Sequence, residues 1–152
     1  VGLQKAESSL DQNRWAKAAR LGWLGMLVPE QYGGSGDSLS DAAVLYEELG
    51  RGPLPGPFFS SGVLGALTVL EAGTEEQRQR ILPAVARGER VLTVAITEPN
   101  TSWGPGGITL APQGRNGSFV LNGTKLFVSD ATSRSGWAPR SWEPRSWYSR
   151  SC

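Results

Sequence analysis

Apolar residues recur at helical spacing through the first ninety residues of the chain. Three sites there have the form of a capping box, in which a hydroxyl residue and a polar residue three positions later satisfy free backbone donors at a helix start. The three boxes are Ser9 with Gln12, Ser38 with Asp41, and Thr74 with Gln77. After Ser38 the apolar positions predict a helix that buries one face and ends at Gly50 and Gly52.

Two further helical stretches complete this part of the chain. Residues 58–70 are apolar nearly all round, which predicts a helix enclosed by others, and residues 75–87 begin with acidic residues and end with Arg87, as the helix dipole favours. Residues 22–36 are rich in glycine and predict a structured loop between the first two helices. We therefore expect residues 1–90 to form an N-terminal helical bundle.

The hydrophobic period changes at Val91. Residues 91–97 are rich in β-branched side chains, residues 108–111 form a short candidate strand, and residues 119–121 and 124–128 flank Asn122-Gly123, a strong signal for a two-residue hairpin. Four short strands cannot close a sandwich without leaving edges uncovered. The predicted fold class is α+β, with an incomplete antiparallel β-domain over residues 91–131.

Residues 132–152 have a different character. From Gly136 the chain repeats Trp, Pro, Arg and Ser with a period of five, which fits neither helix nor strand, so this tail is expected to be disordered. Its Trp and Arg side chains could stack on single-stranded nucleic acid, but such repeats also arise when a GC-rich frame is misread. We favour a break in the reading frame near Ala131 and expect no nucleic-acid partner.

Composition narrows the chemistry. The chain has net charge +1, and because the last twenty residues hold four arginines against one glutamate, the remainder sums to about −2 and suggests no polyanion partner. The chain has no His, which excludes Ser-His triads, and its one cysteine, Cys152, excludes an internal disulfide. Without His and with one Cys a zinc site is excluded as well, so no metal site is predicted. No stretch reaches the ~20 apolar residues of a membrane span. A soluble, cytoplasmic protein is the expectation.

The most informative segment is Thr97-Glu98-Pro99, at the end of the first predicted strand. A strand end can deliver a hydroxyl and backbone amides to a flavin, and Pro99 turns the chain around the ligand. On these three residues alone, an ordinary turn is the better interpretation. Two other candidates are weaker: Gly33 to Gly36 lacks the strand and Lys of a phosphate loop, and Glu47 and Glu48 are adjacent and read as solvated or paired surface charges.

A wider set of motifs changes that balance. The sequence from Trp15 to Ala131 resembles the acyl-CoA dehydrogenase family in six ordered stretches. These are Gly22-Trp23-Leu24-Gly25, Val28-Pro29-Glu30 with Tyr32 to Gly36, Glu47 to Arg51, Gly73 to Gln77 with Leu82-Pro83 and Gly88-Glu89, Ala95 to Pro99, and Leu121 to Ser129. The tail lies outside the resemblance.

The resemblance implies FAD as cofactor and names its contacts. Ile96 and Thr97 match residues whose backbone and hydroxyl bind the flavin pyrimidine edge; Phe127 stands where the family usually has Trp, and Ser129 where a Thr or Ser approaches the reactive flavin nitrogen. The family usually continues after Thr-Glu-Pro with two residues and then Gly-Ser-Asp.

This chain departs from that pattern. It has Ser102-Trp103-Gly104 at that place, which puts the usual pyrophosphate and thioester contacts in doubt. Ser102 and Trp103 stay candidate cofactor-binding residues. Trp103 either covers the ligand or narrows the acyl channel, or it packs against the loop that contains Pro105.

The implied reaction is α,β-dehydrogenation of an acyl-CoA thioester, with an electron-transferring flavoprotein as a possible partner. In the family the catalytic base lies in a C-terminal helical domain, so we assign no catalytic residue here and expect this polypeptide alone to be inactive, with a homo-oligomer only for a full-length parent. The alternative is a non-catalytic truncated paralogue that binds acyl-CoA or a protein.

Overall fold

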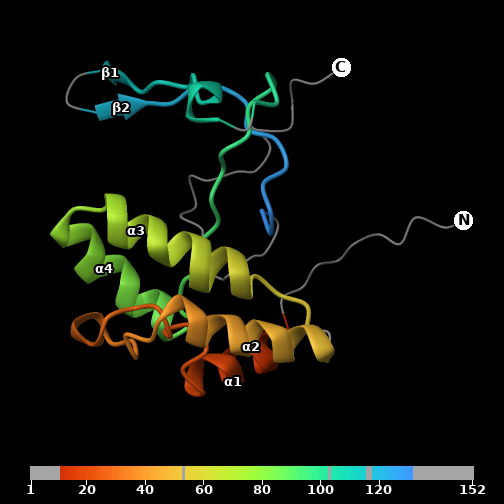
Figure 1. Ribbon diagram of the computed structural model, residues 1–152. Coiled ribbons are helices and arrows are strands. Elements are labelled where there is room, and N and C mark those ends of the chain that lie inside the picture. Colours follow the sequence, from red (N-terminus) through yellow and green to blue (C-terminus); the bar gives the residue numbers. More distant parts are fainter. Residues whose placement is uncertain (1–10, 53, 103, 116–117, 132–152) are drawn as a thin grey trace, which may run out of the picture. The chain divides into compact units, whose positions relative to one another are not determined.

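The computed structural model describes residues 11–52, 54–102, 104–115 and 118–131. The chain divides into two compact units, each described by itself (Figure 1). Of the described residues, the helical unit contains those from 11 to 94 together with 130 and 131, and the second unit contains those from 95 to 129. The described residues are mostly helical, as the sequence predicts for the N-terminal part.

Two of the predicted capping boxes are confirmed. Helix α2 (Leu39–Arg51) begins after Ser38, whose backbone N–H and side chain pair with Asp41, and helix α4 (Glu75–Ala86) begins after Thr74, which pairs with Gln77 in the same way. Gly50 lies inside α2, and Gly52 caps it.

Helix α1 (Gln12–Arg20) begins in a different way. Its cap is Asp11, whose carboxylate accepts from the N–H groups of Asn13 and Arg14 at 3.1 Å each. The predicted cap at Ser9 lies outside the described residues. A carboxylate at the cap also suits the positive end of the helix dipole.

The apolar run is helical from Phe58 onward, but it is not a uniform α-helix. Residues Ser60–Gly65 form a π-helical stretch, η2, which continues into α3 (Ala66–Ala72). The expectation that this run is enclosed on all sides is only partly correct, because Phe59 is 54% exposed and Leu64 is 40% exposed. At Gly65 an added Cβ would lie 2.4 Å from the Cβ of Leu92, so glycine allows residues 91–94 to pack directly on η2.

The core of the helical unit lies between these helices and the α1–α2 loop. Its largest fully buried side chains include Leu24, Val28, Leu82 and Val85. The rings of Trp15 and Phe58 pack with centroids 5.2 Å apart, and Trp15 Nε1 donates to the carbonyl of Gly88 at 2.8 Å. Burying one such apolar side chain stabilises a fold by roughly 1.5–3 kcal/mol.

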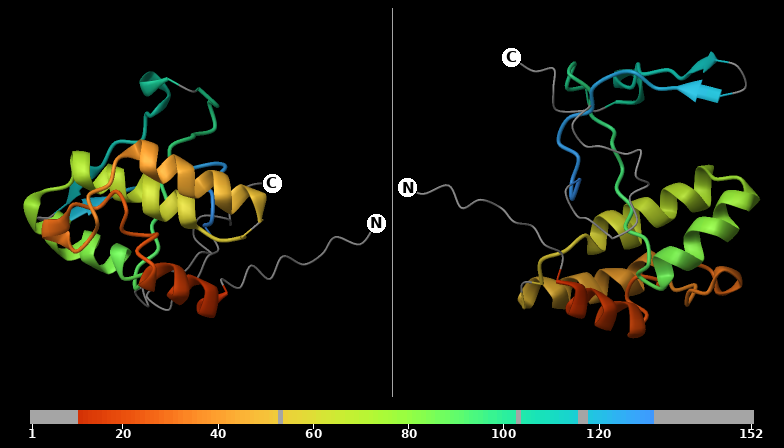
Figure 2. Two further views of the ribbon diagram at one scale, coloured as in Figure 1. Left: turned by 60° about the horizontal axis from the view of Figure 1, so that its bottom comes forward. Right: turned by 180° about the vertical axis from the view of Figure 1, so that it is seen from behind.

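The glycine-rich loop between α1 and α2 is packed, as predicted, and contains a short 3₁₀ turn, η1 (Glu30–Tyr32). Its backbone closes on itself through Ser35 N–H to Gly25 O at 3.0 Å and Gly36 N–H to Val28 O at 2.9 Å. A Cβ on Gly34 would lie 2.0 Å from the carbonyl oxygen of Val28. The two views in Figure 2 show this loop beside α4.

The described residues of the second unit contain less regular structure than the sequence predicts. Its strands are β1 (Gln113–Arg115) and β2 (Ser118–Val120), an antiparallel pair that aligns Gln113 with Val120 and Arg115 with Ser118; η3 (Pro105–Gly107) precedes them. Residues 91–97, 108–111 and 124–128 form no strand, contrary to prediction.

The predicted hairpin at Asn122-Gly123 is also wrong. The observed strands instead flank residues 116–117, which lie outside the described residues and have the same Asn-Gly sequence. A Cβ on Gly123 would lie 2.7 Å from Leu110 Cδ1, so this glycine permits a close approach rather than a two-residue turn. The larger antiparallel β-domain stays a prediction.

Candidate flavin-binding site

The structure brings together the two segments that the sequence singles out in the second unit. We call residues 95–99 the first segment and residues 121–129 the second segment. The backbone N–H of Leu126 donates to the carbonyl of Thr97 at 2.8 Å, and Lys125 Nζ donates to the carbonyl of Ile96 at 3.1 Å. Two of the predicted flavin contacts are therefore held directly by the second segment.

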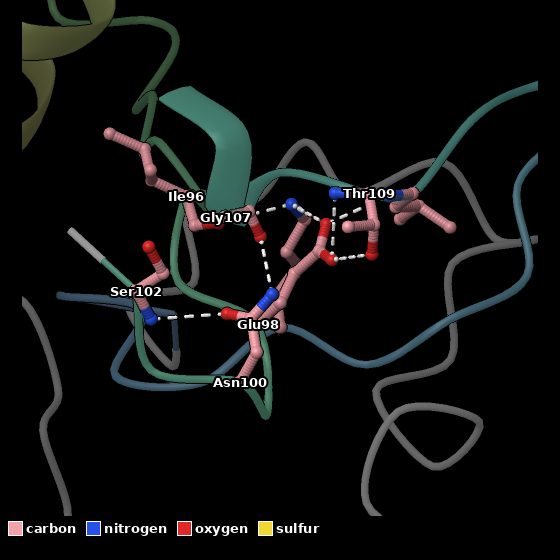
Figure 3. A network of polar contacts seen from close by, with 8 residues as sticks. Ile96, Glu98, Asn100, Ser102, Gly107 and Thr109 are labelled. Carbon is pink, nitrogen blue, oxygen red and sulfur yellow. Dashed lines mark hydrogen bonds and ion pairs between the residues drawn. The ribbon is translucent and has the colours of Figure 1, made fainter. Parts of the chain in front are cut away.

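A buried carboxylate, Glu98, organises the surroundings of both segments (Figure 3). Its Oε2 accepts from the backbone N–H of Thr109 at 3.0 Å and from the Thr109 hydroxyl at 2.6 Å. Its Oε1 accepts from the backbone N–H of Leu110 at 3.0 Å and from Lys125 Nζ at 2.8 Å. Both carboxylate oxygens are thus fully occupied, as burial of a charge requires.

These contacts determine the charge state of Glu98. The hydrogen bond from Lys125, followed by those from the Thr109 hydroxyl and the Thr109 and Leu110 amides, lowers the pKa of Glu98 to about 2, against an opposing effect of burial. Each of these donors binds the ionised form better than the neutral form. Glu98 is therefore an anion throughout the physiological pH range, and its oxygens are already occupied by four hydrogen-bond donors of the chain.

The turn after the first segment is fixed by its own polar groups. Thr101 N–H donates to Glu98 O at 2.8 Å, and the Asn100 side chain both donates to Gly107 O at 2.9 Å and accepts from Ser102 N–H at 3.1 Å. Figure 3 shows Asn100 between Ser102 and Gly107. Ser102 is exposed, and Trp103 lies outside the described residues.

Besides Ser102, three of the predicted contacts are open to solvent. Phe127 is 85% exposed and Ile96 is 53% exposed, and Ser129 is exposed as well, whereas Thr97 is half-buried. Phe127 also has a positive φ of 52°, which is rare for a bulky residue. Thr101 and Asp130 have similar values of 52° and 55°. The contacts of these residues with a flavin stay predictions.

Sequence reasoning gave no role to the residues that hold this region together, namely Glu98, Thr109 and Lys125. Glu98 and Lys125 are 27 positions apart, and neither has a local partner that would signal an ion pair. The signal that could have been used is that Glu98 lies in the first segment, that Lys125 lies in the second, and that their charges are opposite.

One other candidate from the sequence, the pair Glu47 and Glu48, can be judged from the structure. Glu47 and Glu48 pair with Arg51 at 2.7 and 3.0 Å on the exposed face of α2, as the sequence predicts.

In the described part of the chain no group of three or more acidic or Cys side chains could hold a metal ion. Among the same residues, no helix combines the length and apolarity needed to cross a membrane.

Comparison with known proteins identifies the family. The family described as "Acyl-CoA dehydrogenase, N-terminal domain" matches residues 3–89, which is more than half of the chain. The chain is 31% identical over 116 residues to acyl-CoA dehydrogenase FadE12 of Mycobacterium tuberculosis, covering 76% of this chain and 30% of that protein. It is 30% identical over 118 residues to the mitochondrial long-chain specific acyl-CoA dehydrogenase of Sus scrofa, covering 76% of this chain and 27% of that protein.

Solved structures give the same result. The acyl-CoA dehydrogenase of Geobacillus kaustophilus superposes with a TM-score of 0.67 at 27% identity, covering 82% of this chain and 33% of that one. An acyl-CoA dehydrogenase of Bacillus anthracis, complexed with FAD, gives 0.68 at 31% identity, covering 80% and 22%. The helical unit thus defines an acyl-CoA dehydrogenase N-terminal domain.

The chain belongs to the acyl-CoA dehydrogenase family. It spans about three tenths of the length of the curated relatives that it matches.

Proposed function

We propose that this chain supplies the N-terminal helical domain and part of the flavin site of an FAD-dependent acyl-CoA dehydrogenase. The observation that carries the proposal is the hydrogen bond from Leu126 N–H to Thr97 O at 2.8 Å, which joins the two segments that match the family's flavin motifs. The proposed substrate is an acyl-CoA thioester, and the proposed reaction is its α,β-dehydrogenation.

The residues present suit the ring end of FAD. An isoalloxazine ring offers a flat apolar face and neutral heteroatoms, and Phe127 presents an exposed aromatic ring, while Thr97 and Ser129 carry hydroxyls. Lys125 is not needed as a ligand, because its side chain is only 12% exposed and already contacts Glu98 and Ile96. The donor set therefore fits an uncharged ring edge.

FAD, when bound, would supply the acceptor for the hydride that leaves the β-carbon of the substrate. This chain's own residues would position it: the backbone of Ile96 and the hydroxyl of Thr97 at the pyrimidine edge, the ring of Phe127 against the flavin face, and the hydroxyl of Ser129 near the reactive nitrogen. Fixed hydroxyls and amides of this kind stabilise charge that develops during reduction.

Three finer proposals accompany this function. Residues 1–90 act as the helical domain, residues 91–131 as part of the family's antiparallel β-domain, and residues 132–152 as a tail outside both. The 152-residue polypeptide, assayed alone, is expected to lack dehydrogenase activity, because none of its residues is placed as the general base. Loss of such a base lowers a rate by about 10²–10⁴.

The test is a titration of the purified full chain with FAD, followed by flavin fluorescence. We expect saturable binding that weakens by about tenfold in Thr97→Ala and in Ser129→Ala, since each removes one hydrogen bond to the ring, worth about 1 kcal/mol or somewhat more. Matched controls are Thr68→Ala and Ser40→Ala, which remove the same groups from exposed positions on helices of the other unit.

Two results would contradict the proposal. Equal FAD affinity in all four variants would remove Thr97 and Ser129 from the site. Binding of an acyl-CoA without any binding of FAD would favour the alternative, a non-catalytic acyl-CoA-binding module.

A further inference from the structure

We propose that Glu98 and Lys125 form a positioning pair that sets the spacing of the two flavin-facing segments and thereby the environment of the bound flavin ring. This inference rests on the proposed flavin site. It concerns two residues that lie between the predicted contacts and that the proposed reaction does not itself use.

The first support is how the second segment holds Thr97. Lys125 Nζ donates to Ile96 O at 3.1 Å and to Glu98 Oε1 at 2.8 Å, so one ammonium group contacts the residues on both sides of Thr97. The next residue, Leu126, donates its N–H to Thr97 O at 2.8 Å. Residues 125 and 126 therefore fix three consecutive residues of the first segment.

The second support is where Lys125 stands along its own segment. Phe127 and Ser129 follow it by two and four positions, and Phe127 takes a left-handed backbone conformation directly after Leu126. The chain thus leaves the clamped residues and turns at once into the predicted ring contacts. Any shift of Lys125 is transmitted to Phe127 over a very short length of chain.

The third support is that the pair is buried, so that water cannot take the place of a lost partner without a cost in free energy. The Lys125 side chain is 12% exposed and that of Glu98 is 6% exposed. Glu98 uses its remaining lone pairs on Thr109 and Leu110, which ties a third stretch of the second unit to the same point. Removing one partner leaves the other charge buried without compensation, which is far more disruptive than loss of an exposed ion pair.

The experiment compares the full chain with Glu98→Gln, Lys125→Met, Lys125→Arg and the double variant Glu98→Gln/Lys125→Met. FAD is the probe. Affinity is measured by flavin fluorescence, and the visible absorbance spectrum of the bound flavin is recorded at saturating FAD, so that incomplete occupancy does not contribute. Helix content is followed by far-UV circular dichroism, and hydrogen exchange of the Leu126 amide is followed without FAD.

We expect Glu98→Gln and Lys125→Met to weaken FAD binding by at least about tenfold, because each removes a charge-assisted hydrogen bond. The bound-flavin spectrum should change at saturation, and the Leu126 amide should exchange faster. Lys125→Arg keeps the cation and should lie closer to the unsubstituted chain. The double variant removes both charges and should regain stability without regaining the original spectrum.

The matched control is Glu89→Gln, which makes the same substitution in the exposed Arg87–Glu89 pair of the helical unit. It should leave affinity, spectrum and Leu126 exchange unchanged. If the unsubstituted chain binds FAD and the Glu98 and Lys125 variants match it in affinity and spectrum, the positioning pair is refuted and the flavin site stands. If the unsubstituted chain binds no FAD, the proposed flavin site fails, and this inference fails with it.

Discussion

Each of the two units is stabilised internally by a different kind of buried group. In the helical unit, the described residues bury Leu24, Val28, Leu82 and Val85 completely. Among the described residues of the second unit, the buried positions are Gly107 and Glu98, and Glu98 is a charged residue with an ammonium partner.

This difference bears on how each unit fails. An apolar core loses stability with the volume that is removed, and this loss does not depend on pH. A buried polar network depends on every member, so one missing donor or one proton affects the whole arrangement. The comparison predicts that the helical unit responds to cavities and close contacts, whereas the second unit responds to charge.

The largest effect is expected from Leu82→Ala, which empties a fully buried position in α4. The loss should be about 2–5 kcal/mol of unfolding free energy, measured by chemical denaturation followed at the helical circular dichroism band. The control Leu39→Ala removes the same atoms from a side chain that is 61% exposed and should cost less than about 0.5 kcal/mol. Equal losses in the two variants would show that α4 does not pack as described.

A close-contact change comes next. Gly34→Ala would place a Cβ 2.0 Å from Val28 O, and the loop must shift, at a cost of about 1–3 kcal/mol or more. Gly50→Ala is the matched control, because nothing lies within 4 Å of the added Cβ inside α2. It should instead stabilise the helix by about 0.5–1 kcal/mol. Denaturation midpoints of the two variants should therefore move in opposite directions.

The second unit should show its dependence on charge in acid. Because the pKa of Glu98 is lowered from 4.5 to about 2, its ionised form favours the folded unit above the normal Glu range, and this contribution is lost as the pH falls toward 2. The amide NMR signals of Thr109 and Leu110 should titrate with a midpoint near that value. The Ser35 amide, which donates to Gly25 O, serves as a reference. A midpoint near 4.5 would mean that the Glu98 network does not form.

The smallest effect concerns exposed charge in the helical unit. Glu47→Gln removes one partner of Arg51 on the surface of α2, where both side chains are about two-thirds exposed. The expected loss is at most about 0.5 kcal/mol, with further weakening of the pair at high salt. A loss comparable to that of Leu82→Ala would erase the distinction between surface and core that the comparison draws.

Local signals in the sequence predicted the helical unit well. The boxes at Ser38 and Thr74 act within four residues, so their geometry follows from sequence alone. The packing of the π-helical stretch η2 could not be predicted in this way, because Gly65 in that stretch lies against Leu92, which is distant in sequence.

The second unit shows the opposite case. Asn-Gly occurs twice, at 116–117 and 122–123, and both copies satisfy the hairpin rule. The choice between them depends on strand pairing and on the contact of Gly123 with Leu110, neither of which is local. The family motifs predicted that both segments contact one flavin ring, but the hydrogen bonds that join them, and the part played by Glu98 and Lys125, were not predicted.

The bond from Trp15 Nε1 to Gly88 O has a consequence for synthesis of the chain. Its two ends are 73 positions apart. At about 5–20 residues per second, a ribosome needs roughly 4–15 s to pass from one to the other. During that interval the indole of Trp15 lacks this partner, because Gly88 follows the end of α4 and has not yet been made.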